Sequence, residues 1–342
     1  RTDAQVFFDA ERAAVDLVAA YLDRYGIDAD RHSDGYTFVA HSPRAVEDVR
    51  AYGESYRRRY GLPFEFLGRA AMAERGLHSP EFHAAANVPV GFALNPMKFV
   101  LGLSRAAETA GVRMFSHTPV ERLSREDGHV LHTPQGRVRA RTVLFATNGY
   151  GSDDLPPALA HRFLPVQSNI LVTRPLTDDE IAAQGWWSAQ MVVDSRSLLH
   201  YLRLLPDRRM LFGLRGSVRA TEATIAATQA RARADFDRIF PAWRHVETPH
   251  FWSGLICMSR RLVPFAGPVP GMENAFAAFA YHGSGVSMAP YAGALIADMA
   301  LGRQARPHPD LMKRPPARFE LGPLRRLALG PAFAWYQWRD RA

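Results

Sequence analysis

The sequence is poor in cysteine and in long apolar runs, and each shortage excludes a class of protein. Cys257 is the only cysteine among the 342 residues, so no disulfide can form within them, as is usual for a reducing compartment. No stretch has the ~20 uninterrupted apolar residues of a membrane-spanning helix. Residues 286–301 come closest, but Pro290 and Asp298 interrupt them. We therefore expect a cytoplasmic protein without a membrane span.

Lysine is also scarce, which bears on possible nucleic-acid partners. Lys98 and Lys313 are the only lysines, so the net charge of +8 rests almost entirely on arginine. The arginines are scattered among acidic residues, and the densest run, residues 57–59, follows Glu54. Nucleic-acid surfaces require clustered positive charge. The composition therefore does not favour a nucleic-acid partner, and a hydrophobic content of 47% is typical of globular domains.

Two motifs that would carry chemistry are missing. The Gly-x-Gly-x-x-Gly turn seats a dinucleotide pyrophosphate on a helix N-terminus. Gly149 and Gly151, like Gly283 and Gly285, have its leading spacing, but no glycine follows three residues later. His129 and His132 fall on an expected turn and strand and so do not share a helix face, and we expect no metal site.

Apolar periodicity predicts an α/β (α+β) fold. The helices are expected at 4–25, 96–110, 221–239 and 324–338, with Ser42 as N-cap of a further helix. The first strands are expected at 36–41, 112–115, 118–123, 130–133 and 137–141. The apolar run 142–146 predicts a central strand covered on both faces. An antiparallel block is expected from 167–173, 191–193, 198–205 and 210–214, and a further strand at 249–258.

Residues 267–302 are the most informative segment. They predict a turn, a buried strand, a glycine-bearing loop and a helix that begins where the loop ends. Gly283 and Gly285 lack a Cβ, so a ligand can approach the loop backbone closely. The helix N-terminus has unpartnered N–H groups and a positive dipole end. This arrangement suits an electron-rich ring edge.

The same segment resembles the C-terminal flavin-contacting segment of the FAD-dependent amine and amino-acid oxidase family. This is the group of D-amino-acid oxidase, glycine oxidase and sarcosine oxidase, with the glutamylputrescine oxidase-like branch nearest. Segments 96–120, 143–150 and 252–267 resemble further family segments in the same order. The resemblance implies non-covalently bound FAD. It also implies cofactor contacts by Val120, Ala146, Thr147, Asn148, Gly149, Gly283, Ser284, Gly285, Val286 and Ser287.

The resemblance further implies a domain arrangement. A Rossmann-like FAD-binding domain without its first βαβ unit would comprise residues 1–30, 96–165 and 253–303. An inserted antiparallel-sheet substrate domain would comprise 31–95 and 166–252, and residues 304–342 would form a tail and helix. Because Arg1 lies in what resembles the helix after the pyrophosphate turn, we expect an N-terminal truncation and weak FAD binding by the chain as given.

Family members that oxidise free α-amino acids carry a carboxylate-binding arginine just after a Trp-x-Gly element. Here Trp252-Ser253-Gly254 is followed by Leu255 and Ile256, and Arg261 replaces a common aspartate. These departures imply that the small-molecule substrate is an amine or an N-substituted amino compound. Substrate binding is expected from Trp252 together with Tyr201, Arg203 and Arg215, although the last three could equally be surface strand residues.

The implied reaction is hydride transfer from a C–N bond to flavin, followed by hydrolysis of the imine. His282 is expected to act as an active-site base or gate, with packing or capping as the alternative. Cys257 lies near a position of covalent flavin attachment, but a buried apolar role is favoured. Leu211 replaces an oxygen-activating lysine, so a dehydrogenase that uses a quinone or carrier protein is one alternative. A non-catalytic accessory flavoprotein-like subunit is another.

Overall fold

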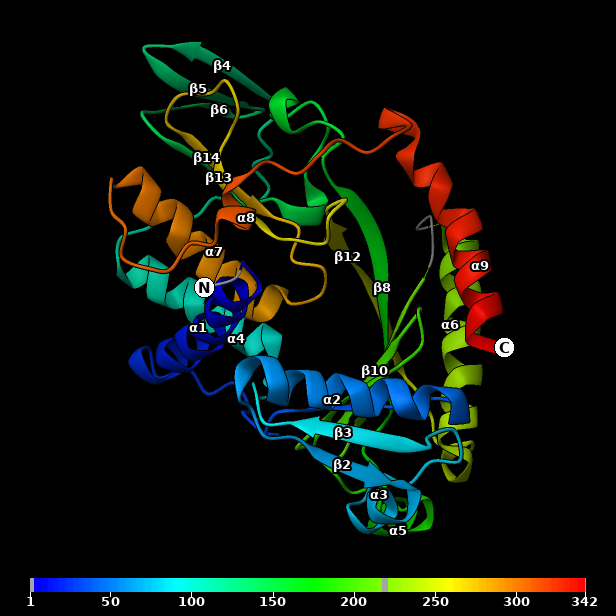
Figure 1. Cartoon of the computed structure of the whole chain (residues 1–342). Helices are drawn as coiled ribbons and strands as arrows, with labels where there is room; N and C mark the ends of the chain where they lie inside the picture. Colours follow the sequence, from blue (N-terminus) through cyan, green and yellow to red (C-terminus); the bar gives the residue numbers. More distant parts are fainter. Residues whose placement is uncertain (1–2, 217–220, 342) are drawn as a thin grey trace. The chain divides into compact units, whose positions relative to one another are not determined.

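The chain forms two compact units in the computed structural model, which describes residues 3–216 and 221–341 (Figure 1). The first unit comprises residues 1–29, 96–166 and 255–328. The second comprises residues 30–95, 167–254 and 329–342. Two strands, β8 (Leu164–Val172) and β12 (His250–Met258), cross from one unit into the other.

The first unit contains a pair of parallel strands. In its three-stranded sheet, β7 (Val143–Phe145) is parallel to β14 (Ala275–Phe279), and β14 is antiparallel to β13 (Phe265–Pro268). Val143 lies opposite Ala275, so both parallel strands end at the same edge of the sheet. A separate antiparallel sheet contains β4 (Arg122–Glu126), β5 (Gly128–Thr133) and β6 (Gly136–Ala140).

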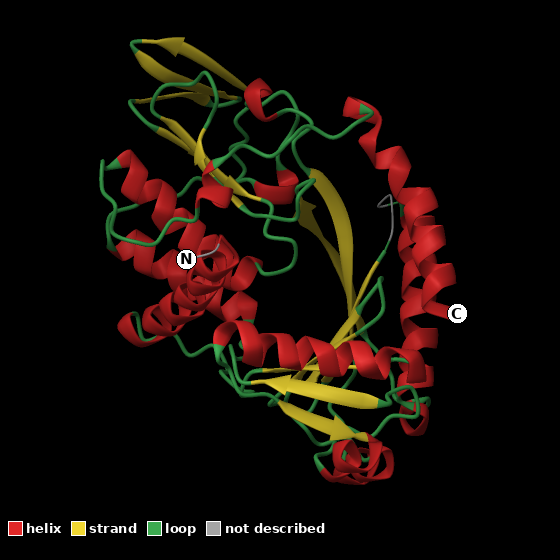
Figure 2. Cartoon of the chain, in the orientation of Figure 1, coloured by secondary structure: helices red, strands yellow, loops and turns green. Residues whose placement is uncertain are grey.

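Helices of the first unit pack closely because their contact residues are small. Ala10 and Ala14 of α1 (Asp3–Arg24) are buried against Tyr291 and Ala292 of α7 (Gly285–Ala300). Figure 2 shows these helices in red. The remaining helices of this unit are α4 (Pro96–Thr109), α8 (Asp310–Lys313) and the 3₁₀ turns η2 (Asn148–Tyr150), η3 (Pro157–Leu159) and η5 (Gly322–Ala328).

The second unit is built on an eight-stranded sheet with strand order β12-β8-β11-β10-β9-β1-β3-β2. The expected antiparallel block is present in β8, β11, β10 and β9, but β1 is parallel to β9, so the sheet is mixed. The strands are β1 (Tyr36–Val39), β2 (Glu65–Gly68), β3 (Ala84–Val88), β9 (Met191–Asp194), β10 (His200–Leu204) and β11 (Met210–Arg215).

Alternation along β10 and β11 gives this sheet two different faces. Leu202, Phe212 and Leu214 are buried on the face that packs on α6 (Glu222–Ile239), where Phe236 joins an aromatic core. The opposite face carries polar side chains. The other helices are α2 (Val46–Tyr60), α3 (Arg69–Glu74), α5 (Asp178–Gln184), α9 (Leu329–Arg341) and the 3₁₀ turns η1 (Pro43–Ala45) and η4 (Pro241–Trp243).

Several sequence predictions were wrong in detail. Residues 112–115 form no strand and the next strand begins only at Arg122, because Pro119 and the left-handed His117 (φ 52°) interrupt extended pairing. β7 is an edge strand rather than a central one, and Leu144 is 44% exposed. The Ser42 side chain does not cap a helix, since a 3₁₀ turn precedes α2. The expected helix 324–338 is divided between η5 and α9.

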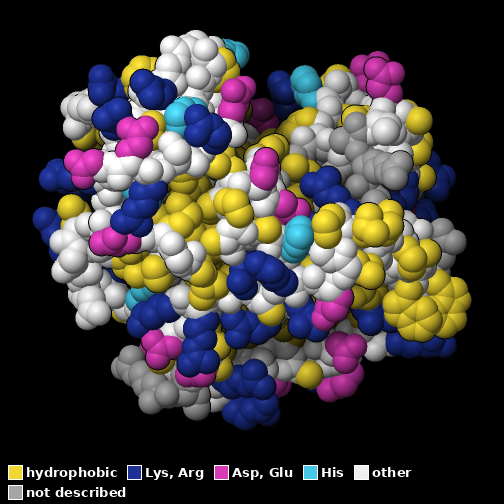
Figure 3. All heavy atoms as spheres, turned by 90° about the horizontal axis from the view of Figure 1, so that it is seen from above, with side chains coloured by type: hydrophobic (Ala, Val, Ile, Leu, Met, Phe, Trp, Pro, Cys, Tyr) yellow, Lys and Arg dark blue, Asp and Glu magenta, His cyan; other side chains and the backbone are white. Residues whose placement is uncertain are grey.

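Charges of both signs are interleaved on the surface, as Figure 3 shows for one face, where dark blue and magenta side chains alternate. Within residues 3–216 and 221–341, no helix combines the length and apolarity needed to cross a membrane.

The aromatic core of the second unit yields a stability prediction. Phe236 is fully buried, so Phe236→Ala should lower the free energy of unfolding by roughly 3–5 kcal/mol through lost burial and a residual cavity. Gln229→Ala, at an exposed position of the same helix, should change it by less than about 0.5 kcal/mol. Urea denaturation followed by tryptophan fluorescence measures both values. Equal midpoints for the two variants would contradict the assigned core.

Candidate functional site

The edge where β7 and β14 end brings two groups of expected cofactor residues together. The Asn148 side-chain oxygen accepts a 3.0 Å hydrogen bond from the backbone N–H of Ala280. This bond ties the turn after β7 to the loop after β14. Ala146 and Thr147 are exposed at this edge, whereas Gly149 is buried against Leu255. The backbone after both strands therefore faces one region, as at ligand sites of parallel sheets.

The N-terminus of α7 is the second feature of this edge. The helix has 16 residues, no side chain caps its start at Ser284, and its first turn contains no acidic residue. Gly283 has φ +119°, a conformation that favours glycine. Gly283, Ser284 and Val286 are exposed, and Ser287 is half-buried. The positive end of the helix dipole is therefore available to an electron-rich group.

Packing within the protein does not require glycine at position 285. Its φ lies outside the left-handed region, and a Cβ there would meet only the Tyr281 side chain, at 3.7 Å. The chain itself could therefore accommodate a side chain at this position. A ligand that approaches the first turn of α7 closely could not.

His282 is held beside this loop by two contacts from β12 and the segment after it. Its backbone N–H donates to the Cys257 carbonyl at 3.2 Å, and its Nε2 lies 3.3 Å from the Ser259 hydroxyl. Cys257 is 1% exposed, and burial raises the pKa of its thiol to about 12. The thiol is therefore protonated at neutral pH and fills apolar space.

The third expected cofactor segment, at Val120, lies next to the separate antiparallel sheet of β4, β5 and β6. Val120 is half-buried in the loop before β4. The next residue, Glu121, donates its backbone N–H to the His132 carbonyl at 2.9 Å, which anchors the loop to β5.

In the second unit, expected substrate residues share the polar face of the eight-stranded sheet. Tyr201 and Arg203 of β10 lie opposite Gly213 and Leu211 of β11, and Arg215 follows on the same face. The Tyr201 hydroxyl is 2.5 Å from the Ser168 hydroxyl of β8. A Cβ at Gly213 would lie 1.9 Å from the Tyr201 ring, so the ring rests directly on the bare backbone.

The Arg203 guanidinium is the most unusual group on this face. Its Nη2 donates to the Leu94 carbonyl at 2.9 Å, and its buried Nε has no partner among the described residues. Burial lowers the pKa of Arg203 and also that of Arg215. A buried cation with neutral partners is unfavourable unless an anion compensates it. Arg203 is therefore suited to a carboxylate-bearing ligand.

Sequence reasoning missed His32, which lies close enough to Arg203 for electrostatic interaction. Its Nδ1 contacts the Asp30 carbonyl at 2.6 Å, and its buried Nε2 has no partner among the described residues. Burial, followed by the Arg203 charge, lowers the pKa of His32, so the imidazole is neutral at pH 7. No periodicity or spacing in the sequence connects residue 32 with residue 203.

Trp252 is not brought to the Arg203 group by the sheet. It is 50% exposed on β12, and β8 and β11 separate that strand from β10. Among the described residues, no group of three or more His, Cys, Asp or Glu could hold a metal ion.

The first unit thus contains a parallel strand pair with an uncapped helix at its edge, and the second contains a large mixed sheet with one polar face. The family profile described as FAD dependent oxidoreductase matches residues 2–299. The chain therefore belongs to this FAD-dependent oxidoreductase family.

Individual relatives agree with this assignment. The chain is 31% identical to the probable oxidoreductase OrdL of Rhizobium meliloti (strain 1021), over 99% of this chain and 77% of that protein. It is 27% identical to the gamma-glutamylputrescine oxidoreductase of Escherichia coli (strain K12), over 85% and 67% of the two chains. The glycine oxidase structure from Geobacillus kaustophilus has a TM-score of 0.76 at 18% identity, over 90% and 82% of the two chains.

The residues at the β7–β14 edge fit the ring end of FAD, the cofactor of this family. Exposed backbone at Gly283 and Ser284 and the first turn of α7 can approach a flat, electron-rich ring without obstruction. The sequence contains no Gly-x-Gly-x-x-Gly turn, so these residues account for the ring end and not for the pyrophosphate.

Gly285→Val tests this fit in protein produced from the complete natural gene. The variant should lose most of its flavin, because a branched side chain would occupy the space of the ring while the fold accommodates it. Gly293→Val is the matched control, since it lies in the same helix and a Cβ there meets nothing within 4 Å. The measurements are flavin absorbance per protein and far-UV circular dichroism. Full flavin content in Gly285→Val would show that the loop has only a structural role.

Proposed function

We propose that this protein oxidises a C–N bond of an amine or N-substituted amino compound that carries a carboxylate away from the reacting nitrogen. The observation that carries the proposal is the half-buried Arg203 guanidinium, whose hydrogen-bond acceptor among the described residues is the neutral Leu94 carbonyl. A carboxylate would supply the missing charge and accept from the unpaired Nε.

Near the reacting nitrogen of the substrate, the protein is expected to have no charged side chain that binds a carboxylate. Ile256 is half-buried on β12, at the position where amino-acid-oxidising relatives are expected to carry an arginine. An α-carboxylate beside this side chain would be desolvated without compensation. The name of one relative, gamma-glutamylputrescine oxidoreductase, supports an N-substituted amino compound as substrate.

In this mechanism the residues of the chain bind the substrate and orient it toward the flavin. Bound FAD supplies the acceptor for the hydride that leaves the carbon next to nitrogen, and water then hydrolyses the imine product. Arg203 and Arg215 fix the distal carboxylate. Burial raises the pKa of Tyr201, so its neutral hydroxyl, paired with Ser168, orients the substrate by hydrogen bonding. The α7 N-terminus would hold the electron-rich end of the flavin ring, and His282 would hold or move a proton beside it.

One observation favours a second candidate, a dehydrogenase that passes electrons to a quinone or carrier protein. Leu211 lies opposite Arg203 on the polar face, where the family resemblance predicts an oxygen-activating lysine. An apolar side chain there provides no cation for oxygen activation.

The substrate class is tested by anaerobic bleaching of the flavin, which reports reduction whichever acceptor is used. A γ-glutamylated amine should bleach the flavin at least ten times faster than D-alanine or glycine, since a lost charged hydrogen bond costs about 1.5–3 kcal/mol. The opposite order, with rapid bleaching by D-alanine or glycine, would overturn the proposal.

Arg203→Met tests the role of the guanidinium separately. It should weaken binding of the γ-glutamylated amine about 10- to 100-fold and leave an amine without a carboxylate unaffected. The uncharged amine is the matched control, because it reports any general damage to the sheet. An equal loss for both substrates would assign Arg203 a structural role.

A further inference from the structure

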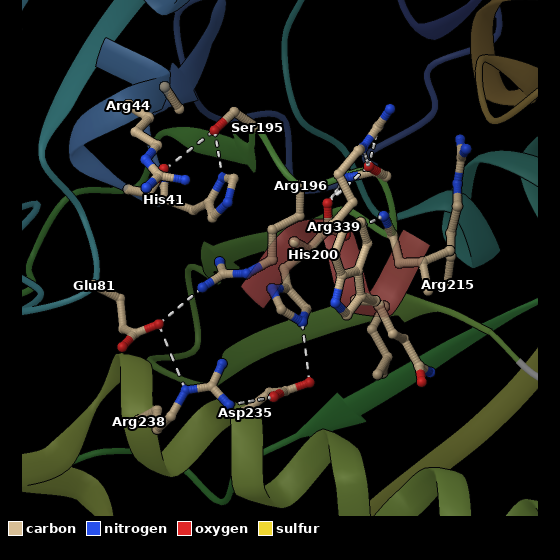
Figure 4. A pocket seen from close by; sticks show the side chains of 18 of the residues that line it. His41, Arg44, Glu81, Ser195, Arg196, His200, Arg215, Asp235, Arg238 and Arg339 are labelled. Carbon is tan, nitrogen blue, oxygen red and sulfur yellow. Dashed lines mark hydrogen bonds and ion pairs between the residues drawn. The ribbon is translucent and has the colours of Figure 1, made fainter. Parts of the chain in front are cut away.

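A large cavity in the second unit lies on the opposite side of the sheet from Tyr201 and Arg203. Its volume is about 1170 Å³, and its walls come from the ends of β1, β9 and β10, from α6 and from the C-terminal helix α9. Figure 4 shows His41 and Ser195 on one side, with Arg238 and Asp235 of α6 on another. The volume exceeds that of a single ion and matches that of a small organic ligand.

The lining carries an excess of positive charge. Arg215 borders the cavity at the end of β11, but its side chain belongs to the Tyr201 face. The other described lining residues include five arginines and four carboxylates, namely Arg44, Arg196, Arg231, Arg238 and Arg339 against Asp48, Glu81, Asp235 and Asp340. His200 also lines the cavity. Burial disfavours its charge, but the carboxylates of Asp194 and Asp235 outweigh burial and raise its pKa. The buried Asp194, which is outside the lining, balances this histidine.

Most of the carboxylates are already engaged within the cavity wall. Glu81 accepts from Arg196 at 2.8 Å and pairs with Arg238 at 3.5 Å. Asp235 is bonded to both His200 and Arg238. Asp340 accepts from the backbone N–H groups of residues 197 and 198. These bonds join the carboxylates to groups other than Arg231 and Arg339.

Two arginines have neutral hydrogen-bond acceptors. Arg231 donates to the carbonyl oxygens of Arg215 and Gly216, at 2.9 and 3.2 Å. The Arg339 Nε donates to the Ser197 hydroxyl at 3.0 Å. Burial lowers the pKa of Arg231, which reflects the poor hydration of its charge, and the nearby Asp235 is shared with two other cations. An external anion would compensate the poorly hydrated charge of Arg231. The exposed Arg339 guanidinium could donate to the same anion.

We propose that this cavity binds an aromatic phosphomonoester, with Arg231 and Arg339 as the principal partners of its phosphate. A phosphate dianion can accept hydrogen bonds from more than one guanidinium, and its oxygens suit the guanidinium fork. Trp338 also lines the cavity, is 62% exposed and packs on Trp335 with ring centroids 5.1 Å apart. This exposed ring provides a surface for an aromatic group.

Calorimetric titration of FAD-saturated protein with phenyl phosphate tests the proposal. Saturation with FAD prevents the probe from competing at the cofactor site. Phenyl phosphate should bind and phenol should not, and the affinity should fall as salt is raised. Arg231→Gln should weaken binding about 10- to 100-fold, and Arg231→Lys should weaken it less. Arg58→Gln, at an exposed position of α2, is the matched control and should leave affinity unchanged.

Two further variants make the result specific to this cavity. Trp338→Ala should weaken binding of phenyl phosphate but not of inorganic phosphate. Arg203→Met, on the other face of the sheet, should leave both affinities unchanged, so the outcome is independent of the proposed substrate site. If Arg231→Gln does not fold, the affinity of Arg231→Lys for phenyl phosphate tests the role of Arg231 instead. Equal affinity for phenyl phosphate and phenol, or unchanged affinity in both Arg231 variants, would overturn the proposal.

Discussion

The cofactor region depends on the parallel pairing of β7 with β14. The register that sets Val143 opposite Ala275 makes two strands, more than a hundred residues apart in the chain, end at one edge. The bond from Ala280 N–H to Asn148 then fixes the loops that follow. Without this pairing, the N-terminus of α7 would have no neighbouring strand end to complete a ligand surface. The close packing of α1 against α7 also holds α7 in its position in the first unit.

In the second unit, alternation of side chains along the strands separates a core-forming face of the sheet from a polar face. One set of side chains on β10 and β11 builds an aromatic core with α6, which makes the sheet rigid. The other set presents Tyr201, Arg203 and Arg215 on the polar face. Since neighbouring residues point to opposite faces, the core fixes the positions of the polar groups at single-residue precision. A shift of one residue in register would bury the arginines and expose the core.

Much of this architecture could be predicted from local patterns. The helix over residues 4–25 follows an apolar stripe at helical spacing, and the glycine loop at 283–285 precedes α7 as expected. The edge position of β7 could not be predicted, because an apolar run does not reveal how many neighbours a strand has. The strand expected at 112–115 was wrong because short apolar runs carry no information about pairing partners.

The candidate sites were predictable only in part, for a similar reason. Tyr201 and Arg203 could be proposed because they lie on an expected antiparallel strand and are polar or charged. The partnerless Nε2 of His32 and the cavity beside α9 arise from residues far apart in sequence, which only the folded chain brings together. Burial and hydrogen-bond deficits are properties of three-dimensional packing, and a linear pattern does not encode them.

The bare backbone beneath Tyr201 also constrains how this sheet can evolve. A methyl group at Gly213 would overlap the ring, so a larger residue there requires a smaller one at position 201. Positions 201 and 213 should therefore vary as a pair among related sequences, with glycine retained wherever a bulky ring faces it. The residues at positions 201 and 213 therefore determine how much space the polar face leaves for a ligand. Relatives with a different pair of residues at these positions should bind ligands of a different width.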